Sequence, residues 1–174
     1  EKELDSYCLP GSKFIGLAEP IIPEIPAAGG SMTYGLPFGV GFALAKKFKK
    51  EQGKVYVIES DGGMQGGQTW EAILIAAHHK LNNLILIIDD NSLQAMGKTK
   101  EILNIYPLDK KFKVFGWDVK KINGHNFSQI EKVLSQAQGK LKKPLAIIAK
   151  TIKGYPISFM RNENMYHYKN LSKQ

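Results

Sequence analysis

The 174-residue sequence contains very little cysteine and no long hydrophobic run. Its single cysteine, Cys8, cannot form a disulfide within the chain, so we expect a reducing compartment, the cytoplasm. The longest apolar runs have the length of a strand and are too short to cross a bilayer as a helix, so we expect no membrane partner. The first residues, which begin at Glu1, carry no signal-peptide pattern, and we expect some sequence upstream.

The sequence also lacks the pattern that would connect its positive charge with a nucleic acid. The net charge is +8, from 24 lysine and arginine residues against 16 aspartate and glutamate residues. The lysines form short clusters in segments 46–50, 110–113, 120–121 and 140–143, where helix ends and strand edges meet solvent. No aromatic residues are interleaved with them as a platform for stacked bases. We therefore interpret the clusters as solvated surface and expect no nucleic-acid partner.

The sequence does contain an alternation of helices and buried strands. Continuous apolar runs at 55–58, 84–88 and 145–149 predict strands covered on both faces, and 118–122 predicts a shorter strand. Helices are predicted over 31–50, 69–79, 108–115 and 127–137, and the segment 1–30, rich in proline and glycine, predicts an extended loop. This alternation is typical of a three-layer, doubly wound α/β domain with a mainly parallel sheet and helices on both faces. No repeat or linker divides the chain, so we expect one domain over residues 1–174.

Polar residues follow two of the predicted strands. The turn Asp61-Gly62-Gly63 follows the first strand, and Asn91 follows the second. Ligands of such sheets bind at the carboxyl ends of the strands, so Asp61 and Asn91 converge if these strands are neighbours. A carboxylate and an amide oxygen suit magnesium or calcium, and two glycines leave room for a diphosphate. The pattern predicts a metal–diphosphate site, although each residue alone could belong to an ordinary turn; a nicotinamide site has little support because no G-x-G-x-x-G follows a strand.

These motifs resemble the amino-terminal, thiamine-diphosphate-binding domain of the transketolase family. The core of the likeness is Ser60-Asp61-Gly62 with a closing Asn91. Matching segments also lie at 4–8, 68–72, 76–84, 90–94, 122–125, 153–154 and 157–160, so that the likeness covers nearly the whole chain. It implies thiamine diphosphate as the cofactor, together with Mg2+ (or Ca2+).

The resemblance assigns a role to individual residues. It implies that Asp61, Asn91 and the backbone carbonyl of Leu93 bind the metal. Glu71 matches a glutamate at the subunit contact that links two active sites, but a glutamate in the first turn of a helix is equally expected from the helix dipole. Glu71 and His167, which matches a histidine near the diphosphate, are the catalytic candidates. The predicted cofactor-binding residues are Gly30, Ser31, Met32, Asp61, Gly62, Gly63, Asn91, Leu93 and His167.

The resemblance further implies a reaction and a partner. Transketolases transfer a two-carbon ketol unit between sugars, with thiamine diphosphate as the electron sink. The glutamate that activates the cofactor lies in a pyrimidine-binding domain, which we expect to be absent from this chain. We therefore expect one subunit of a split enzyme that acts on a sugar phosphate. Its partner would be a pyrimidine-binding transketolase subunit, in a heterotetramer or a homodimer-type assembly.

Several positions depart from the family pattern. Ser60 stands in place of the first glycine of the motif, and Gly66 replaces an acidic residue at the subunit contact. Leu17 stands where the family has a substrate-facing histidine, and Tyr34 replaces a histidine or glutamine of the cofactor loop. These changes leave two alternatives open. One is a two-carbon transfer from an alpha-keto acid in a specialised sugar pathway, and the other is a non-catalytic transketolase-like scaffold subunit.

Overall fold

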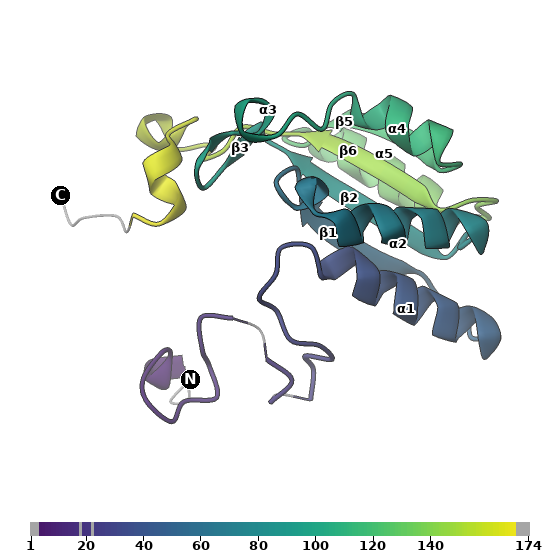
Figure 1. Ribbon diagram of the computed structural model, residues 1–174, viewed down its shortest axis with the longest axis horizontal. Helices are drawn as coiled ribbons and strands as arrows, with labels where there is room; N and C mark the ends of the chain where they lie inside the picture. Colours follow the sequence, from purple (N-terminus) through teal and green to yellow (C-terminus); the bar gives the residue numbers. More distant parts are fainter. Residues whose placement is uncertain (1–3, 18, 22, 170–174) are drawn as a thin grey trace.

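A four-stranded parallel sheet forms the centre of the computed structural model, which describes residues 4–17, 19–21 and 23–169 (Figure 1). The strand order is β1-β2-β6-β5, formed by β1 (Val55–Ser60), β2 (Leu84–Asp90), β6 (Leu145–Lys150) and β5 (Asp118–Asn123). The central strands β2 and β6 are almost wholly buried, which explains their continuous apolar sequences. β1 pairs directly with β2, so the condition for the convergence of the two polar strand ends is met.

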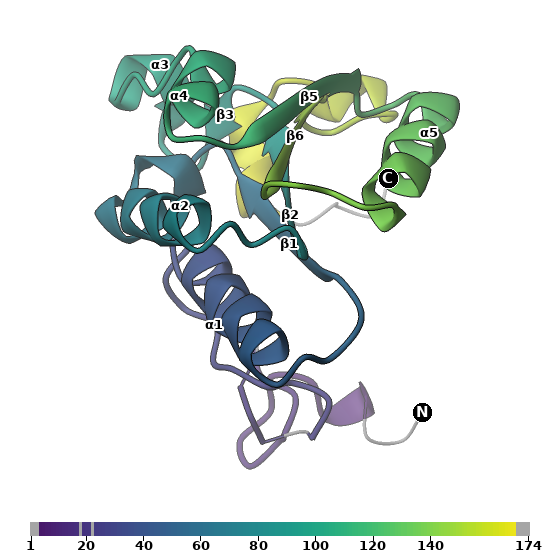
Figure 2. The ribbon, with the colours of Figure 1, turned by 90° about the vertical axis from the view of Figure 1, so that its right-hand side faces the viewer.

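Helices cover both faces of this sheet (Figure 2). The helices α1 (Gly35–Phe48), α2 (Gly67–His78) and α4 (Leu108–Val114) pack on one face, in a core centred on Leu84, Leu86 and Ile88. The helix α5 (Phe127–Gln138) covers the other face, where Val133 and Ala137 pack against the remaining apolar side chains of β2 and β6. The predicted three-layer α/β class is therefore confirmed.

Glycine allows α1 to approach β1 closely. A Cβ atom added to Gly39 would lie 2.2 Å from Cγ2 of Val57, and one added to Gly35 would lie 2.7 Å from Oε2 of Glu59. Both glycines therefore face the strand, one helical turn apart. The close approach that the glycine-rich sequence predicted for this helix is made to β1.

The predicted boundaries agree with the structure within a few residues, apart from the start of α1. That helix begins at Gly35 and not at residue 31, because residues 31–34 form a separate turn in which Tyr34 N–H donates to the Ser31 carbonyl. At the start of α5 the cap is Asn126, whose Oδ1 accepts a hydrogen bond of 3.0 Å from Gln129 N–H. Within the described ranges, no helix is both long enough and apolar enough to cross a membrane.

The sequence did not predict the short elements around the carboxyl edge of the sheet. They comprise the hairpin of β3 (Leu93–Gln94) and β4 (Gly97–Lys98), the short helix α3 (Thr99–Ile102), and the 3-10 turns η2 (Gly63–Gln65), η3 (Ser158–Met160) and η4 (Asn164–His167). Most of the described part of segment 1–30 lacks regular structure, as predicted, apart from the 3-10 turn η1 (Leu4–Ser6).

Candidate metal and cofactor site

Asp61 lies directly after β1 and its side chain is completely buried. Gly62 N–H donates to Oδ1 at 2.9 Å, and the buried Thr99 hydroxyl donates to Oδ2 at 2.9 Å. Burial raises the pKa of Asp61, because a carboxylate loses its hydration there, and the nearby Asp90 raises it further; the bonds from Thr99 and Gly62 act in the opposite direction. Asp61 is thus held in one orientation but lacks a positive charge, since no ion pair to it is found in the part of the chain that the structure describes.

Tyr106 joins the ends of β1 and β2. Its hydroxyl lies 2.7 Å from Oδ1 of Asp90 and 3.3 Å from Oδ2 of Asp61, and its single proton is donated to the nearer oxygen at any one time. Burial raises the pKa of Tyr106 well above its usual value, and the hydrogen bond to Asp90 adds to this, so the hydroxyl remains a donor. Two buried carboxylates therefore approach one another across a neutral hydroxyl.

Asn91 is oriented by its neighbours at the end of β2. Its side-chain amide donates to Oδ2 of Asp89 at 2.9 Å, and its Oδ1 accepts from Leu93 N–H at 2.9 Å. Asp61 N–H in turn donates to the Asp89 carbonyl at 3.2 Å. The three predicted metal ligands therefore lie at the same edge of the sheet and are connected through Asp89. An amide oxygen retains a second lone pair after accepting one hydrogen bond, so Asn91 can still bind a cation.

The donor set fits a hard divalent cation. A cation beside Asp61 would supply the positive charge that this buried carboxylate lacks, whereas Lys150 Nζ reaches only Asp90, at 3.5 Å. Carboxylate, amide and carbonyl oxygens are the ligands that magnesium and calcium prefer. The described residues contain no cluster of three or more histidine, cysteine, aspartate or glutamate side chains suited to a metal. The coordination sphere would therefore need oxygens from a phosphate and from water, as is usual for magnesium.

The predicted cofactor loop lies against the turn that follows Asp61. A Cβ atom on Gly63 would lie 3.0 Å from the Met32 carbonyl oxygen, and one on Gly66 would lie 1.9 Å from the methyl group of Thr33. Gly30, at a φ of 140°, has a backbone conformation that favours glycine. Two segments that are distant in sequence, 30–33 and 61–66, are thus brought together.

The amides of this turn are less free than the sequence suggested. Gly62 N–H is bonded to Asp61 Oδ1, and Gly63 N–H donates to the Ser60 hydroxyl at 3.0 Å. Ser60 is the last residue of β1 and has strand geometry, which explains why serine is tolerated in place of glycine. The hydroxyl of Ser60 therefore contributes to the shape of the turn.

Glu59 is a residue of this region that sequence reasoning missed. It is 5% exposed, its Oε1 has no hydrogen-bond partner, and burial raises its pKa to about 7. The glycines at positions 35 and 63 make room for its carboxyl group. A signal was present, because Val57 and Glu59 occupy alternate positions of a strand and must point to the same face.

The remaining candidates lie around this site or on the surface. His167 is exposed in η4, with its Nδ1 3.1 Å from Lys153 Nζ; partial burial and the positive charge of Lys153 lower its pKa. η4 is tied to the β3–β4 hairpin by a 2.6 Å hydrogen bond from Asn164 Nδ2 to the Ala95 carbonyl. Glu71 is exposed on α2, near its first turn. Leu17 and Tyr34 are also exposed.

Comparison with known proteins agrees with this geometry. The family model described as "Transketolase, thiamine diphosphate binding domain" matches residues 3–174. The chain belongs to the transketolase family. Its parallel sheet resembles that of the transketolase from Campylobacter jejuni, with a TM-score of 0.85 and 31% identity over 94% of this chain and 27% of that one.

Two relatives among the curated transketolase proteins are single subunits of their enzymes. The chain is 41% identical to one from the apulose-4-phosphate transketolase of Actinobacillus succinogenes, over 84% of this chain and 53% of the relative. It is 37% identical to the 6-deoxy-6-sulfo-D-fructose transketolase subunit SqwG of Clostridium sp. (strain MSTE9), over 83% of this chain and 53% of the relative. The chain thus spans about half the length of these transketolase subunits.

Proposed function

We propose that this protein is the thiamine-diphosphate-binding subunit of a split transketolase, which transfers a two-carbon ketol unit between sugars. The observation that carries the proposal is the buried Asp61, which is fixed by Thr99 and Gly62 but has no positive partner among the described residues. The names of the two relatives support a two-chain enzyme. The 174 residues act as one diphosphate-binding domain in the cytoplasm, and a pyrimidine-binding subunit completes the assembly, as a heterotetramer or in a homodimer-type arrangement.

In this proposal the metal, Mg2+ or Ca2+, is bound by Asp61, Asn91 and the Leu93 carbonyl. Thr99 and Tyr106 keep the carboxylate of Asp61 in place, since their hydroxyls bond to it. The cofactor contacts are assigned to Gly30, Ser31, Met32, Gly62, Gly63 and His167. Thiamine diphosphate supplies the electron sink for carbon–carbon cleavage, and the residue that activates it comes from the partner subunit. Glu71, exposed on α2, is assigned to the subunit contact.

A sugar phosphate is the proposed substrate, and a specific observation favours a second candidate. Leu17 stands in place of the family's substrate-facing histidine and removes a polar partner for a sugar hydroxyl or carbonyl. An alpha-keto acid, which has fewer hydroxyl groups than a ketose phosphate, is therefore the alternative donor. Unchanged turnover of ordinary ketose phosphates by the reconstituted enzyme would eliminate this alternative.

The test uses the full-length protein mixed with its pyrimidine-binding partner. Two-carbon transfer from a ketose phosphate to an aldose phosphate is measured with Mg2+ and thiamine diphosphate. We expect turnover only when both subunits are present, and we expect Asp61→Ala to reduce it by more than about 100-fold because a metal ligand is lost. The matched control is Asp118→Ala, which removes an exposed aspartate at the opposite end of a strand and leaves turnover unchanged.

Three results would contradict the proposal in different ways. Full activity of the protein without a partner would exclude the split arrangement. Full activity of the Asp61→Ala variant would exclude the metal site. Cofactor binding in the assembled complex without turnover of any ketose phosphate or alpha-keto acid would leave a scaffold role for this chain.

A further inference from the structure

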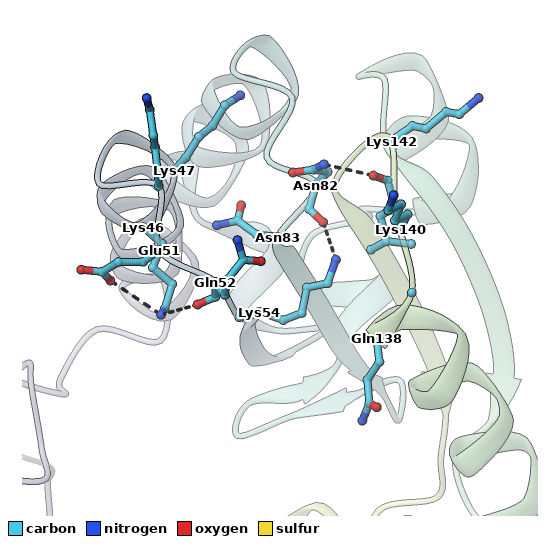
Figure 3. Close-up of a pocket in the computed structure, with 14 residues that line it drawn as sticks. Lys46, Lys47, Glu51, Gln52, Lys54, Asn82, Asn83, Gln138, Lys140 and Lys142 are labelled. Atoms are coloured by element: carbon cyan, nitrogen blue, oxygen red, sulfur yellow. Dashed lines mark hydrogen bonds and ion pairs between the residues drawn. The ribbon is translucent and has the colours of Figure 1, made fainter.

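A second hollow lies at the opposite edge of the sheet from Asp61. It is formed where α1 and α5 end and where β1 and β2 begin, with a volume of about 900 Å³ (Figure 3). We call it the basic hollow. Its charged lining consists of Lys46, Lys47, Lys50, Lys54, Lys140, Lys142 and Glu51.

The ends of helices account for part of this charge. Lys46 Nζ donates to the Gln52 carbonyl at 3.1 Å, Lys54 Nζ donates to the Asn82 carbonyl at 2.9 Å, and Lys47 Nζ donates to the His79 carbonyl, beyond the end of α2. Cations are favoured at the carboxyl ends of helices because the carbonyl groups there carry partial negative charge. Glu51 lies 3.8 Å from Lys46, so the single carboxylate of the lining is already engaged.

The other lysines of the hollow exceed this structural need. Lys50, Lys140 and Lys142 have neither an ion pair nor a side-chain hydrogen bond within the described residues. Burial lowers the pKa of Lys54, which shows that its ammonium group has lost part of its hydration. Like charges that gather in one concave site repel each other, and an anion with several charges would relieve this repulsion.

We propose that the basic hollow binds a small anion with several charges, of the phosphate or diphosphate class. A multiply charged anion is required because a single exposed ion pair in water contributes little free energy. The volume is that of a small-molecule site and exceeds what one phosphate group needs, so a phosphorylated metabolite fits the hollow better than a free monovalent ion. An extended nucleic acid is not favoured, because the charged lining contains no aromatic side chain for base stacking.

The basic hollow is separate from the cofactor site. The strands are parallel, so their amino ends and carboxyl ends lie at opposite edges of the sheet, and β1 places Lys54 and Asp61 at its two ends. The anion would therefore bind without displacing thiamine diphosphate. A site of this kind could report the level of a phosphorylated compound other than the substrate of the enzyme.

The test is calorimetric titration of the full-length protein with inorganic pyrophosphate, with EDTA present so that metal-dependent binding near Asp61 does not contribute. The test variant combines Lys50→Gln, Lys140→Gln and Lys142→Gln. The control variant combines Lys110→Gln, Lys121→Gln and Lys132→Gln, which are exposed lysines outside the hollow. Both variants change the net charge equally, so only the position of the removed charge differs.

We expect saturable binding by the unmodified protein and by the control, and an affinity at least about tenfold lower in the test variant. Circular dichroism checks that both variants remain folded. Equal weakening in the two variants would overturn the proposal, since it would indicate diffuse attraction by net charge. Absence of saturable binding would also overturn it, as would competition by an acidic polypeptide that binds the hollow while pyrophosphate does not.

Discussion

Glu59 shows how one residue can link the core of this protein to solution pH. Its carboxyl group is 5% exposed and lies between the glycines at positions 35 and 63. Burial raises its pKa from 4.5 to about 7. Between these two values the folded state binds a proton that the unfolded state has lost, so the free energy of unfolding falls as the pH rises through this window.

We predict that Glu59→Gln removes this pH dependence. The raised pKa corresponds to a loss of roughly 3 kcal/mol of stability between pH 4.5 and pH 7, and a side chain that does not ionise avoids this loss. Urea unfolding without divalent metal, measured from pH 5 to pH 8, should show a flatter profile for the variant than for the unmodified protein. Glu131→Gln, at an exposed position of α5, is the control and should keep the original slope.

The raised pKa of Asp61 acts in the same direction, so the unmodified protein loses stability with rising pH for more than one reason. The difference between the two profiles isolates the contribution of Glu59. Parallel profiles for Glu59→Gln and the unmodified protein would show that the carboxyl group of Glu59 is ionised without penalty in the fold.

The sequence indicated only part of the site at this scale. Asp61 and Asn91 could be selected because each directly follows an apolar strand, where ligands of parallel sheets bind. Thr99 and Tyr106, which bond to Asp61, could not be selected in this way. They come from irregular segments after β2, and their positions depend on the path of the chain around the hairpin and α3, which no local periodicity encodes.

At the scale of the element, the contact of α1 with β1 depends on where its glycines lie. Gly39 faces the strand, with Val57 in the space that a Cβ atom would occupy. Gly41 lies in the same helix, but nothing lies within 4 Å of the position of its Cβ. The two residues have the same type and the same secondary structure, and they differ in packing.

We predict opposite effects for alanine at these two positions. Gly39→Ala should lower the free energy of unfolding by about 1–3 kcal/mol, because the new methyl group forces α1 away from β1. Gly41→Ala should raise it by up to about 1 kcal/mol, because alanine favours a helix and meets open space. Chemical unfolding of both variants measures the two changes. Stabilisation by Gly39→Ala would show that α1 does not approach β1 as closely as described.

The helices and strands of the layered core could be predicted because burial imposes a period on their sequences. Each strand of the sheet and the helices α2, α4 and α5 were expected within a few residues of their observed bounds. The β3–β4 hairpin, α3 and the 3-10 turns were not expected, because they contain only a few residues each. Their conformations are set by tertiary hydrogen bonds, such as that from Asn164 to the Ala95 carbonyl.

At the scale of the whole molecule, the parallel sheet separates two regions of opposite character. The carboxyl edge gathers the buried carboxylates Asp61 and Asp90, and the amino edge gathers the lysines of the basic hollow. The net charge of +8 therefore says little about the cofactor site, where negative charge is concentrated. A divalent cation at the carboxyl edge would connect this negative region with a diphosphate of the same sign.

The measurement that tests this account most directly is calorimetric titration of the full-length protein, with its partner subunit, with thiamine diphosphate in the presence of Mg2+ and again with EDTA. We predict saturable binding that requires Mg2+. We predict that Asp61→Ala weakens it by more than about 100-fold, while Asp118→Ala binds as the unmodified protein does. Equal affinity with Mg2+ and with EDTA, or unchanged binding by the Asp61→Ala variant, would contradict the assignment of Asp61 to the metal.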